Sequence, residues 1–295
     1  MHGRLEPPAA ALSTRLPSDL AEQVTRALRE DIGPGDITAG LIAQSTRARA
    51  HVLCREAAVL CGAAWFDETF RQIDPLVEIR WHFPDGTHVA ADSILCDLEG
   101  AARSLLSGER TALNFLQLLS GTASVTQRYV AAVAGTACRI LDTRKTVPGL
   151  RSAQKYAVRC GGGTNHRLGL YDMVLIKENH IAAAGSIAAA VAAARRTAPG
   201  VRVEVEAETL DQVRQGLDAR ADIVLLDNFR LADVRAAVAL NRGHSHPAQL
   251  ECSGGIDLKT LHTIAETGVD FISVGSLTKH VTATDLSMRI DAITD

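Results

Sequence analysis

A concentration of basic side chains is the first feature of this sequence that could do chemistry. Between residues 139 and 177 there are eight Lys or Arg and only two acids, Asp142 and Asp172. That window carries a formal charge of about +6, whereas the whole chain has a net charge of −3. A cationic pocket in an acidic protein is typical of a site for a small anion with several charges. The sequence therefore predicts an anionic ligand.

Polar residues and glycines also close each of six short apolar runs. The runs occupy residues 138–143, 173–177, 201–207, 222–228, 249–255 and 271–276. Helical patterns such as 185–197 and 231–240 separate them, and this alternation predicts parallel βα units. Active sites of such folds lie at the C-terminal ends of the strands. The candidate site residues at these ends are Thr143, Arg144, Lys145, Lys177, Glu206, Asp227, Ser253, Gly254, Gly255, Gly275 and Ser276.

The types of these residues indicate what each strand end could bind. Glu206 and Asp227 end neighbouring runs. Carboxylates at this place could bind Mg²⁺ or the hydroxyls of a sugar. The alternative is that each forms a salt bridge to a lysine. Residues 253–255 and 275–276 could hold a phosphate through backbone N–H groups, or could simply form tight turns. The loop 161–167 has three glycines and ends in a cation, which also suits an anion.

The elements that must position these residues suggest two domains. Six runs are fewer than the eight strands of a complete barrel, so we expect an incomplete α/β barrel or an open sheet in the C-terminal part. The N-terminal part has a different pattern. We expect a helix from its N-cap Ser18 to Gly33, strands near 48–54 and 77–83, and a long helix over 101–120. The chain is therefore predicted to be an α/β protein.

Composition argues against several classes of protein. The mild net charge of −3 does not suggest binding to nucleic acid or to a membrane surface. No apolar run reaches the roughly 18 residues of a membrane span. The six cysteines form no CxxC pair, which is typical of reduced thiols in a cytoplasmic protein. Residues 1–17, with Pro7 and Pro8, are expected to form a disordered lead that lacks the apolar core of a signal peptide.

Several longer motifs resemble those of the quinolinate phosphoribosyltransferases, also called nicotinate-nucleotide pyrophosphorylases (carboxylating). The motifs lie at 108–115, 120–123, 142–146, 160–170, 176–180, 204–208, 253–255 and 273–275, with further matches at 30–38 and 55–62. They span roughly residues 18–285 and keep the order of the family. One departure is Cys252, where a smaller residue such as Ala is expected, but Cys is small enough to pack there.

The resemblance implies a fold, an assembly and a reaction. It implies an N-terminal α/β sandwich over residues 18–115 and an incomplete parallel α/β barrel over 116–279, with residues 280–295 packing back on the first domain. It also implies a homodimer, or a dimer-based oligomer, in which Arg110 enters the partner's site. The expected reaction joins quinolinate to 5-phosphoribosyl-1-pyrophosphate in the presence of Mg²⁺. Its products are nicotinate mononucleotide, pyrophosphate and CO₂, in the biosynthesis of NAD.

The resemblance also implies a role for individual residues. Those expected to bind the carboxylates of quinolinate are Arg110, Arg144, His166, Arg167 and Lys177. Those expected to bind 5-phosphoribosyl-1-pyrophosphate are Thr143, Lys145, Glu206, Asp227, Ser253, Gly254, Gly255, Val274, Gly275 and Ser276. Lys145, Glu206 and Asp227 would be catalytic. Mg²⁺ would be held mainly by the substrate, with Glu206 and Asp227 as its candidate protein ligands.

Two alternatives stay open at this point. A phosphoribosyltransferase for a different pyridine base would keep Lys145, Glu206 and Asp227 but could lack part of the quinolinate set. A barrel that binds phosphosugars without catalysis would not need both a carboxylate pair and a dicarboxylate pocket. Four further cations have two possible interpretations: they could contribute to the positive potential around the pocket, or they could be ordinary surface residues. They are Arg139, Arg151, Lys155 and Arg159.

Overall fold

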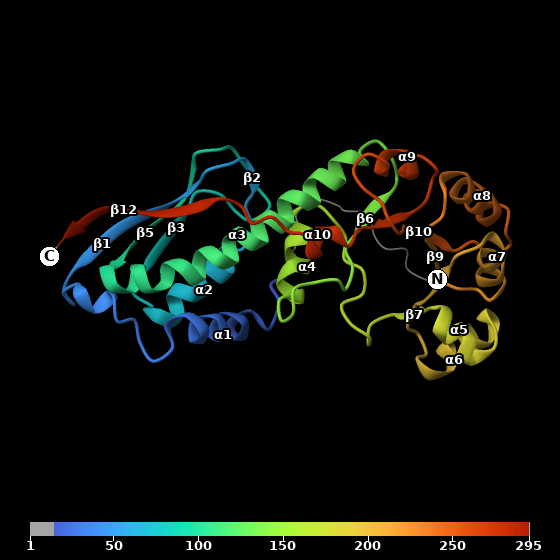
Figure 1. Cartoon of the computed structure of the whole chain (residues 1–295), viewed down its shortest axis with the longest axis horizontal. Helices are drawn as coiled ribbons and strands as arrows, with labels where there is room; N and C mark the ends of the chain where they lie inside the picture. The colour runs from blue at the N-terminus through green and yellow to red at the C-terminus, as the bar shows by residue number, and fades with distance from the viewer. Residues whose placement is uncertain (1–14, 295) are drawn as a thin grey trace. The chain divides into compact units, whose positions relative to one another are not determined.

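The computed structural model describes residues 15–294, so the expected disordered lead falls mostly outside the described residues. The chain forms two compact units, and each is interrupted in sequence (Figure 1). The N-terminal unit comprises residues 15–127, 146–162 and 280–294, and the barrel unit comprises residues 128–145 and 163–279. The domain boundary expected after residue 115 falls inside a single helix and stays a prediction.

The N-terminal unit is built on an antiparallel sheet with the strand order β12-β1-β5-β3. Its strands are β1 Arg47–Cys54, β2 Ala58–Val59, β3 Glu78–Trp81, β4 His88–Val89, β5 Ser93–Ala101 and β12 Leu286–Thr294. Its helices are α1 Leu20–Ile32, η1 Ala39–Leu41, α2 Ala63–Ile73, α4 Arg151–Cys160 and most of α3 Ala102–Ala132. The strands β2 and β4 form a separate two-stranded pair.

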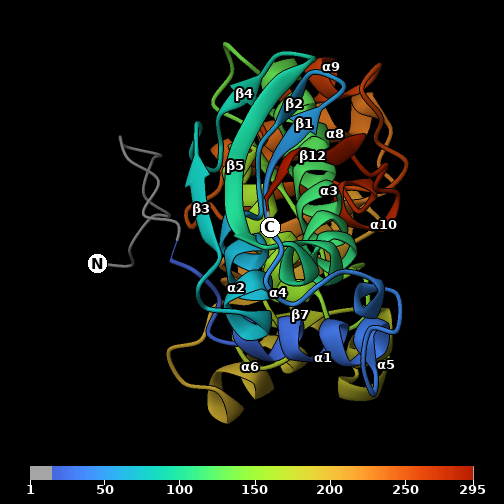
Figure 2. The ribbon, with the colours of Figure 1, turned by 90° about the vertical axis from the view of Figure 1, so that its left-hand side faces the viewer.

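The sheet forms because one face of each central strand is apolar. In β1 the buried residues Ala48, Ala50, Val52 and Cys54 alternate with more exposed ones. They pack with α2 and α3, which lie beside the strands β1, β5 and β12 in Figure 2. β12 pairs antiparallel with β1, and a register shift between Arg49 and Ala50 interrupts that pairing.

A second apolar cluster in the N-terminal unit holds α4. Tyr156 and Ala157 of α4 pack there with Trp65 of α2 and Leu119 of α3. The rings of Trp65 and Tyr156 lie 5.3 Å apart between centroids. The indole N–H of Trp65 donates to Gln23 Oε1 at 2.8 Å, so the buried ring has its polar atom satisfied. This core therefore holds residues 146–162 in the N-terminal unit, although the residues on either side of them in sequence belong to the barrel unit.

The barrel unit contains six parallel strands in the order β6-β11-β10-β9-β8-β7. The strands are β6 Arg139–Leu141, β7 Val174–Ile176, β8 Val203–Ala207, β9 Ile223–Asp227, β10 Gln249–Ser253 and β11 Phe271–Ser273. The helices are α5 Glu178–Ala184, α6 Ile187–Thr197, α7 Leu210–Asp218, α8 Leu231–Arg242, α9 Leu261–Ala265 and α10 Ser276–Lys279. All six predicted strands are confirmed.

The barrel is open, as expected. β6 and β7 are the two edge strands, and no pairing between them closes the sheet within residues 15–294. The central strand β9 is buried over Ile223–Leu226 without alternation, which is the pattern of a parallel strand covered on both faces. Ser186 and Thr209 accept backbone hydrogen bonds at the starts of α6 and α7. In the part of the chain that the structure describes, no helix combines the length and apolarity that crossing a membrane requires.

Candidate functional site

Most predicted site residues of the barrel unit lie at the C-terminal ends of its strands, and His166 and Arg167 lie in the loop between α4 and β7. Thr143–Lys145 follow β6, Lys177 follows β7, and Glu206 lies near the end of β8. Asp227 and Ser253 end β9 and β10 and are register partners. Val274 follows β11, and its N–H donates to Leu141 O of β6 at 2.9 Å. Because parallel strands end at the same edge of a sheet, these residues share one edge of the open barrel.

Lys145 is held against the end of β11. Its backbone N–H donates to Thr143 Oγ1 at 3.1 Å, and its carbonyl accepts from Thr278 Oγ1 at 2.9 Å. A Cβ added to Gly275 would lie 3.0 Å from Lys145 Cδ and 3.8 Å from Lys145 Nζ. Gly275 therefore leaves the space that the lysine side chain occupies, and the two predicted residues lie together.

The two predicted carboxylates have different partners. Glu206 forms an ion pair with Lys177 Nζ; the side chain of Glu206 is 11% exposed and that of Lys177 is 44% exposed. Asp227 Oδ2 accepts from Asn228 Nδ2 at 2.8 Å. The expected alternative of a salt bridge to a lysine is thus true of Glu206 in this structure, and Lys177 is itself a predicted site residue.

Asn228 is a residue that the sequence reasoning passed over. Its backbone has φ of 56°, in the left-handed region where Asn is one of the few tolerated side chains. A Cβ on Gly254, which has φ of 92°, would overlap with Asn228 Oδ1. Asn228 therefore joins Asp227 to the turn at Gly254. The sequence could have pointed to Asn228, because it directly follows the predicted site residue Asp227 at the end of β9.

The positive charge of Arg144 acts on Arg167. Burial, followed by the positive charge of Arg144, lowers the pKa of the Arg167 guanidinium. Arg167 Nη1 donates to Met173 O at 3.2 Å, which fixes the side chain. Guanidiniums that repel each other in a partly buried site are suited to an anion that neutralises both.

His166 faces into the barrel. Its Nε2 lies 3.0 Å from Glu204 Oε2 and 3.4 Å from Glu251 Oε2, and both carboxylates are buried. Burial lowers the pKa of His166, but the hydrogen bonds with Glu204 and Glu251 outweigh it and raise the pKa to about 10. Burial, and then the charge of Glu251, raise the pKa of Glu204 to about 7. Sequence reasoning did not single out Glu204 or Glu251 as site residues.

The remaining cations belong to other surroundings. Arg110 is exposed on α3, in the N-terminal unit. Arg139 begins β6, at the opposite end from the site, and its guanidinium lies 4.8 Å from the Phe271 ring centroid. The other three cations whose role the sequence left undecided lie on α4. Arg159 packs on Tyr156, Arg151 Nε donates to Thr146 Oγ1, and Lys155 is fully buried. Arg139 therefore lies away from the strand ends that carry the site.

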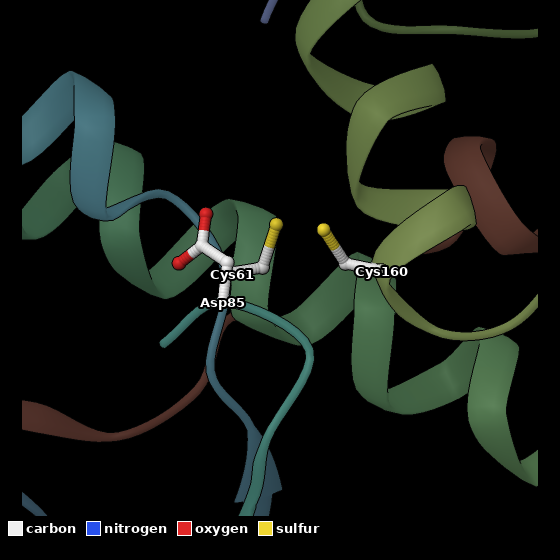
Figure 3. Close-up of side chains that lie close together, drawn as sticks. All are labelled: Cys61, Asp85 and Cys160. Carbon is white, nitrogen blue, oxygen red and sulfur yellow. The ribbon is translucent and has the colours of Figure 1, made fainter. Parts of the chain in front are cut away.

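A group of possible metal ligands in the N-terminal unit does not fit a metal. The ligand atoms of Cys61, Asp85 and Cys160 lie within 4.8 Å of one another, and the two sulfur atoms face each other in Figure 3. The carboxylate of Asp85 already accepts from the N–H groups of Gly62 and Ala63 and from the Tyr156 hydroxyl. Burial raises the pKa of Cys61 well above its usual value, which disfavours the thiolate that binds metals.

Comparison with known proteins identifies related sequences and structures. The model of the quinolinate phosphoribosyl transferase N-terminal domain matches residues 36–120, and that of the C-terminal domain matches residues 122–289. A probable nicotinate-nucleotide pyrophosphorylase (carboxylating) of Bacillus subtilis is 43% identical over 264 residues, 88% of this chain and 90% of the relative. The Mycobacterium leprae protein of that name is 41% identical over 275 residues, 91% of this chain and 96% of the relative. The Francisella tularensis nicotinate-nucleotide pyrophosphorylase structure has a TM-score of 0.91, with 46% identity over 96% of this chain and 100% of that one.

Proposed function

This chain belongs to the quinolinate phosphoribosyltransferase family, and from that membership we propose how its site performs the family's reaction. The protein is a phosphoribosyltransferase that converts quinolinate to nicotinate mononucleotide, with release of pyrophosphate and CO₂. The observation that carries the proposal is the array of cations and carboxylates along one edge of the open barrel.

The cations are proposed to bind the two adjacent ring carboxylates of quinolinate. Arg144 and Arg167 lie close enough for one charge to lower the pKa of the other, so a dianion between them relieves their repulsion. Lys177 is shared with Glu206 and can turn to a substrate carboxylate. His166 belongs to the same group, directly before Arg167. A monocarboxylate would leave part of this charge unneutralised, which favours quinolinate over nicotinate.

A second set of groups is proposed to bind 5-phosphoribosyl-1-pyrophosphate. Glu206 and Asp227 are placed for the ribose hydroxyls, and Lys145 for the pyrophosphate. The residues proposed to surround the 5-phosphate and its neighbours are Thr143, Ser253, Gly254, Gly255, Val274, Gly275 and Ser276. The support is that β9, β10 and β11 are neighbours in the sheet and that Gly254 follows β10 with a positive φ, a backbone conformation found in anion-binding turns.

Mg²⁺ is proposed as the cofactor. Glu206 and Asp227 offer the hard oxygen atoms that Mg²⁺ prefers, and both are only partly exposed at the site edge. Glu206 is already paired with Lys177, so the substrate's own phosphates would supply most of the ligands. When bound, the ion would offset the charge that builds up on the departing pyrophosphate.

The chain's own residues then act by placing charge. As pyrophosphate leaves, the ribose carbon gains positive character, and the carboxylates of Glu206 and Asp227 stabilise it. Lys145 stabilises the pyrophosphate. The pyridine nitrogen of quinolinate attacks the ribose carbon, and Arg144 and Arg167 hold the ring in place for that attack. The ring nitrogen is now positively charged and stabilises the electron pair that stays on the adjacent ring carbon when its carboxylate departs as CO₂. That carbon then takes up a proton from solvent, which gives the product.

We also propose a homodimer in which the partner's Arg110 completes the quinolinate site. Arg110 is exposed on α3, so its guanidinium is available to another subunit. A cytoplasmic location is proposed as well. Its support is that all six cysteines are free and buried, as expected for a protein of a reducing compartment.

The test of the proposed function is product formation. The protein is incubated with quinolinate, 5-phosphoribosyl-1-pyrophosphate and Mg²⁺, and products are identified by mass spectrometry. We expect nicotinate mononucleotide and pyrophosphate in equal amounts. A parallel reaction with nicotinate in place of quinolinate should give little product. Product from nicotinate alone would contradict the assignment of quinolinate as the substrate.

A further inference from the structure

The cationic window 139–177 contains two acids, Asp142 and Asp172, and neither has a part in the proposed reaction. Negative charges among these cations weaken the attraction of the window for an anion, so their presence needs a reason. Their hydrogen bonds supply one. Each carboxylate accepts backbone N–H groups of a single loop, residues 164–172, which carries His166 and Arg167.

Asp142 holds the start of this loop. It directly follows β6 and is fully buried. Its Oδ1 accepts from the backbone N–H of His166 at 2.9 Å, and its Oδ2 accepts from Asn165 Nδ2 at 2.5 Å. Just before them, the N–H of Thr164 donates to Ile140 O at 2.8 Å, and the carbonyl of Thr164 accepts from the N–H of Asp142 at 3.2 Å. The side chain of Asp142 therefore continues the attachment to β6 that the main chain begins at Thr164.

Asp172 holds the far end of the loop. Its Oδ2 accepts from the N–H of Leu168 at 2.6 Å, and its Oδ1 accepts from the N–H of Gly169 at 3.0 Å. Arg167 lies directly between the residues that the two acids hold. Its Nη1 donates to the carbonyl of Met173, which follows Asp172 in the chain. The backbone of Arg167 is thus fixed from both sides by carboxylates.

We propose that Asp142 and Asp172 are positioning residues that hold the loop 164–172 and so place Arg167 for binding quinolinate. Asp142 lies two residues before Arg144 on the same segment, so it also ties the segment of one proposed quinolinate ligand to the loop of the other. Neither acid needs to contact the substrate. This inference rests on the proposed function, because it assumes that Arg144 and Arg167 bind carboxylates of quinolinate.

The direction of the effect of an Asp→Asn change separates this role from a purely electrostatic one. Asparagine removes a negative charge, so quinolinate would bind more tightly if the acids only altered the potential of the site. Asparagine also has one acceptor oxygen where aspartate has two, and its amide nitrogen would face an N–H donor of the loop. If the acids position the loop, that lost attachment loosens Arg167, and quinolinate binds less tightly.

The experiment compares Asp142→Asn and Asp172→Asn with the wild type and with Asp270→Asn. Asp270 Oδ2 accepts from the N–H of Leu250 at 2.8 Å, at the opposite end of the strands from the site, so its variant controls for loss of a carboxylate that holds backbone. We expect the KM for quinolinate to rise on the order of tenfold in both loop variants. The KM for 5-phosphoribosyl-1-pyrophosphate, and both KM values of the control, should change less than about twofold.

Three results would overturn the inference. They are a lower or unchanged KM for quinolinate in either loop variant, equal rises in the KM values of both substrates, and an equal rise in the control. Asp172 is exposed, so its variant keeps the test available if Asp142→Asn does not fold.

A second measurement does not depend on activity. Hydrogen–deuterium exchange, followed by mass spectrometry, reports the protection of the backbone N–H groups in peptides that cover residues 163–172. We expect exchange there to become on the order of tenfold faster in the two loop variants and to stay unchanged in Asp270→Asn. Unchanged exchange in the loop variants would overturn the inference. Because exchange needs no substrate, it remains decisive if the wild type makes no nicotinate mononucleotide, which would overturn the proposed function instead.

Discussion

At the scale of single residues, the site depends on the geometry of its charges as well as on their number. Lys177 and Glu206 neutralise each other, whereas Arg167 is influenced by the like charge of Arg144 and by the acids Glu204 and Asp172. Under the proposed function, the first pair exchanges partners when substrate arrives and the second pair binds its anion. Sequence reasoning selected all four residues. It missed Asn228, Glu204 and Glu251, because what they contact depends on how neighbouring strands pair.

Arg144→Lys tests whether the site needs the shape of guanidinium. Lysine keeps the charge but cannot form two parallel hydrogen bonds to a carboxylate. Loss of one charge-assisted hydrogen bond should raise the KM for quinolinate roughly tenfold or more. Steady-state kinetics with saturating 5-phosphoribosyl-1-pyrophosphate measure this. Arg151→Lys, on α4, is the control, and equal effects in the two variants would argue against a specific role for Arg144.

Gly275→Ala tests the placement of Lys145. The added methyl group would stand 3.0 Å from Lys145 Cδ, tighter than ordinary packing, so the lysine side chain must shift. Displacement of a group that is proposed to stabilise the leaving pyrophosphate should lower kcat on the order of tenfold. Gly243→Ala is the matched control, because its methyl group would meet Ala239 O at an ordinary 3.6 Å. An unchanged kcat in Gly275→Ala would show that Lys145 does not need its present position.

At the scale of elements, the periodicity of the sequence predicted the strands well and the helix ends less well. All six runs of the C-terminal part are parallel strands, since apolar runs bounded by glycines and polar residues are a local signal. The expected N-cap Ser18 is wrong, because α1 begins at Leu20 and Asp19 occupies the cap position. Asp19 makes no capping bond there, and its carboxylate instead accepts from Gln23 and Ser152.

The place of α4 could not be predicted from sequence. Its apolar residues show that it packs on something, but the partners, Trp65 of α2 and Leu119 of α3, lie far away in the chain.

α3 was also predicted too short, at 101–120, whereas it continues to Ala132. Ser120 and Gly121 suggest a stop. Inside the helix, however, Ser120 exchanges hydrogen bonds with the backbone of Cys61, and a side chain at position 121 would collide with Thr282.

Asp85 joins α2 and α4, and its removal should destabilise the N-terminal unit. Its carboxylate accepts from two N–H groups at the start of α2 and from the hydroxyl of Tyr156 on α4 at 2.8 Å. We expect Asp85→Ala to lower the free energy of unfolding by about 1–2 kcal/mol. Tyr156→Phe removes only one of these bonds and should cost less. Urea unfolding measures both, and an equal or larger loss in Tyr156→Phe would contradict this account of Asp85.

At the scale of the whole molecule, the family match covers both units. The two family models together span residues 36–289, so both domains of the family are present in this chain. Most of the predicted site lies within the barrel unit, and Arg110 is the exception. The proposed contribution of a second subunit comes from the resemblance to the family, in which an arginine at this place enters the partner's site.

Mixing inactive subunits tests the shared site. Arg110→Ala and Lys145→Ala are each expected to be inactive as homodimers. In a mixed dimer, one site receives a defect from both variants and the other site receives none. Subunit exchange should therefore restore measurable activity, with at most one intact site in each mixed dimer. Verified mixed dimers that stay inactive would show that Arg110 does not act in the partner's site.

The central claim is that this edge of the barrel couples phosphoribosyl transfer to loss of one particular carboxylate. Quinolinate labelled with ¹³C in either the 2- or the 3-carboxylate distinguishes the two groups, and labelled CO₂ is measured by mass spectrometry. We expect label in CO₂ only from the 2-carboxylate, next to the ring nitrogen, and only when 5-phosphoribosyl-1-pyrophosphate and Mg²⁺ are both present. Label from the 3-carboxylate, or CO₂ release without the ribose donor, would contradict the account.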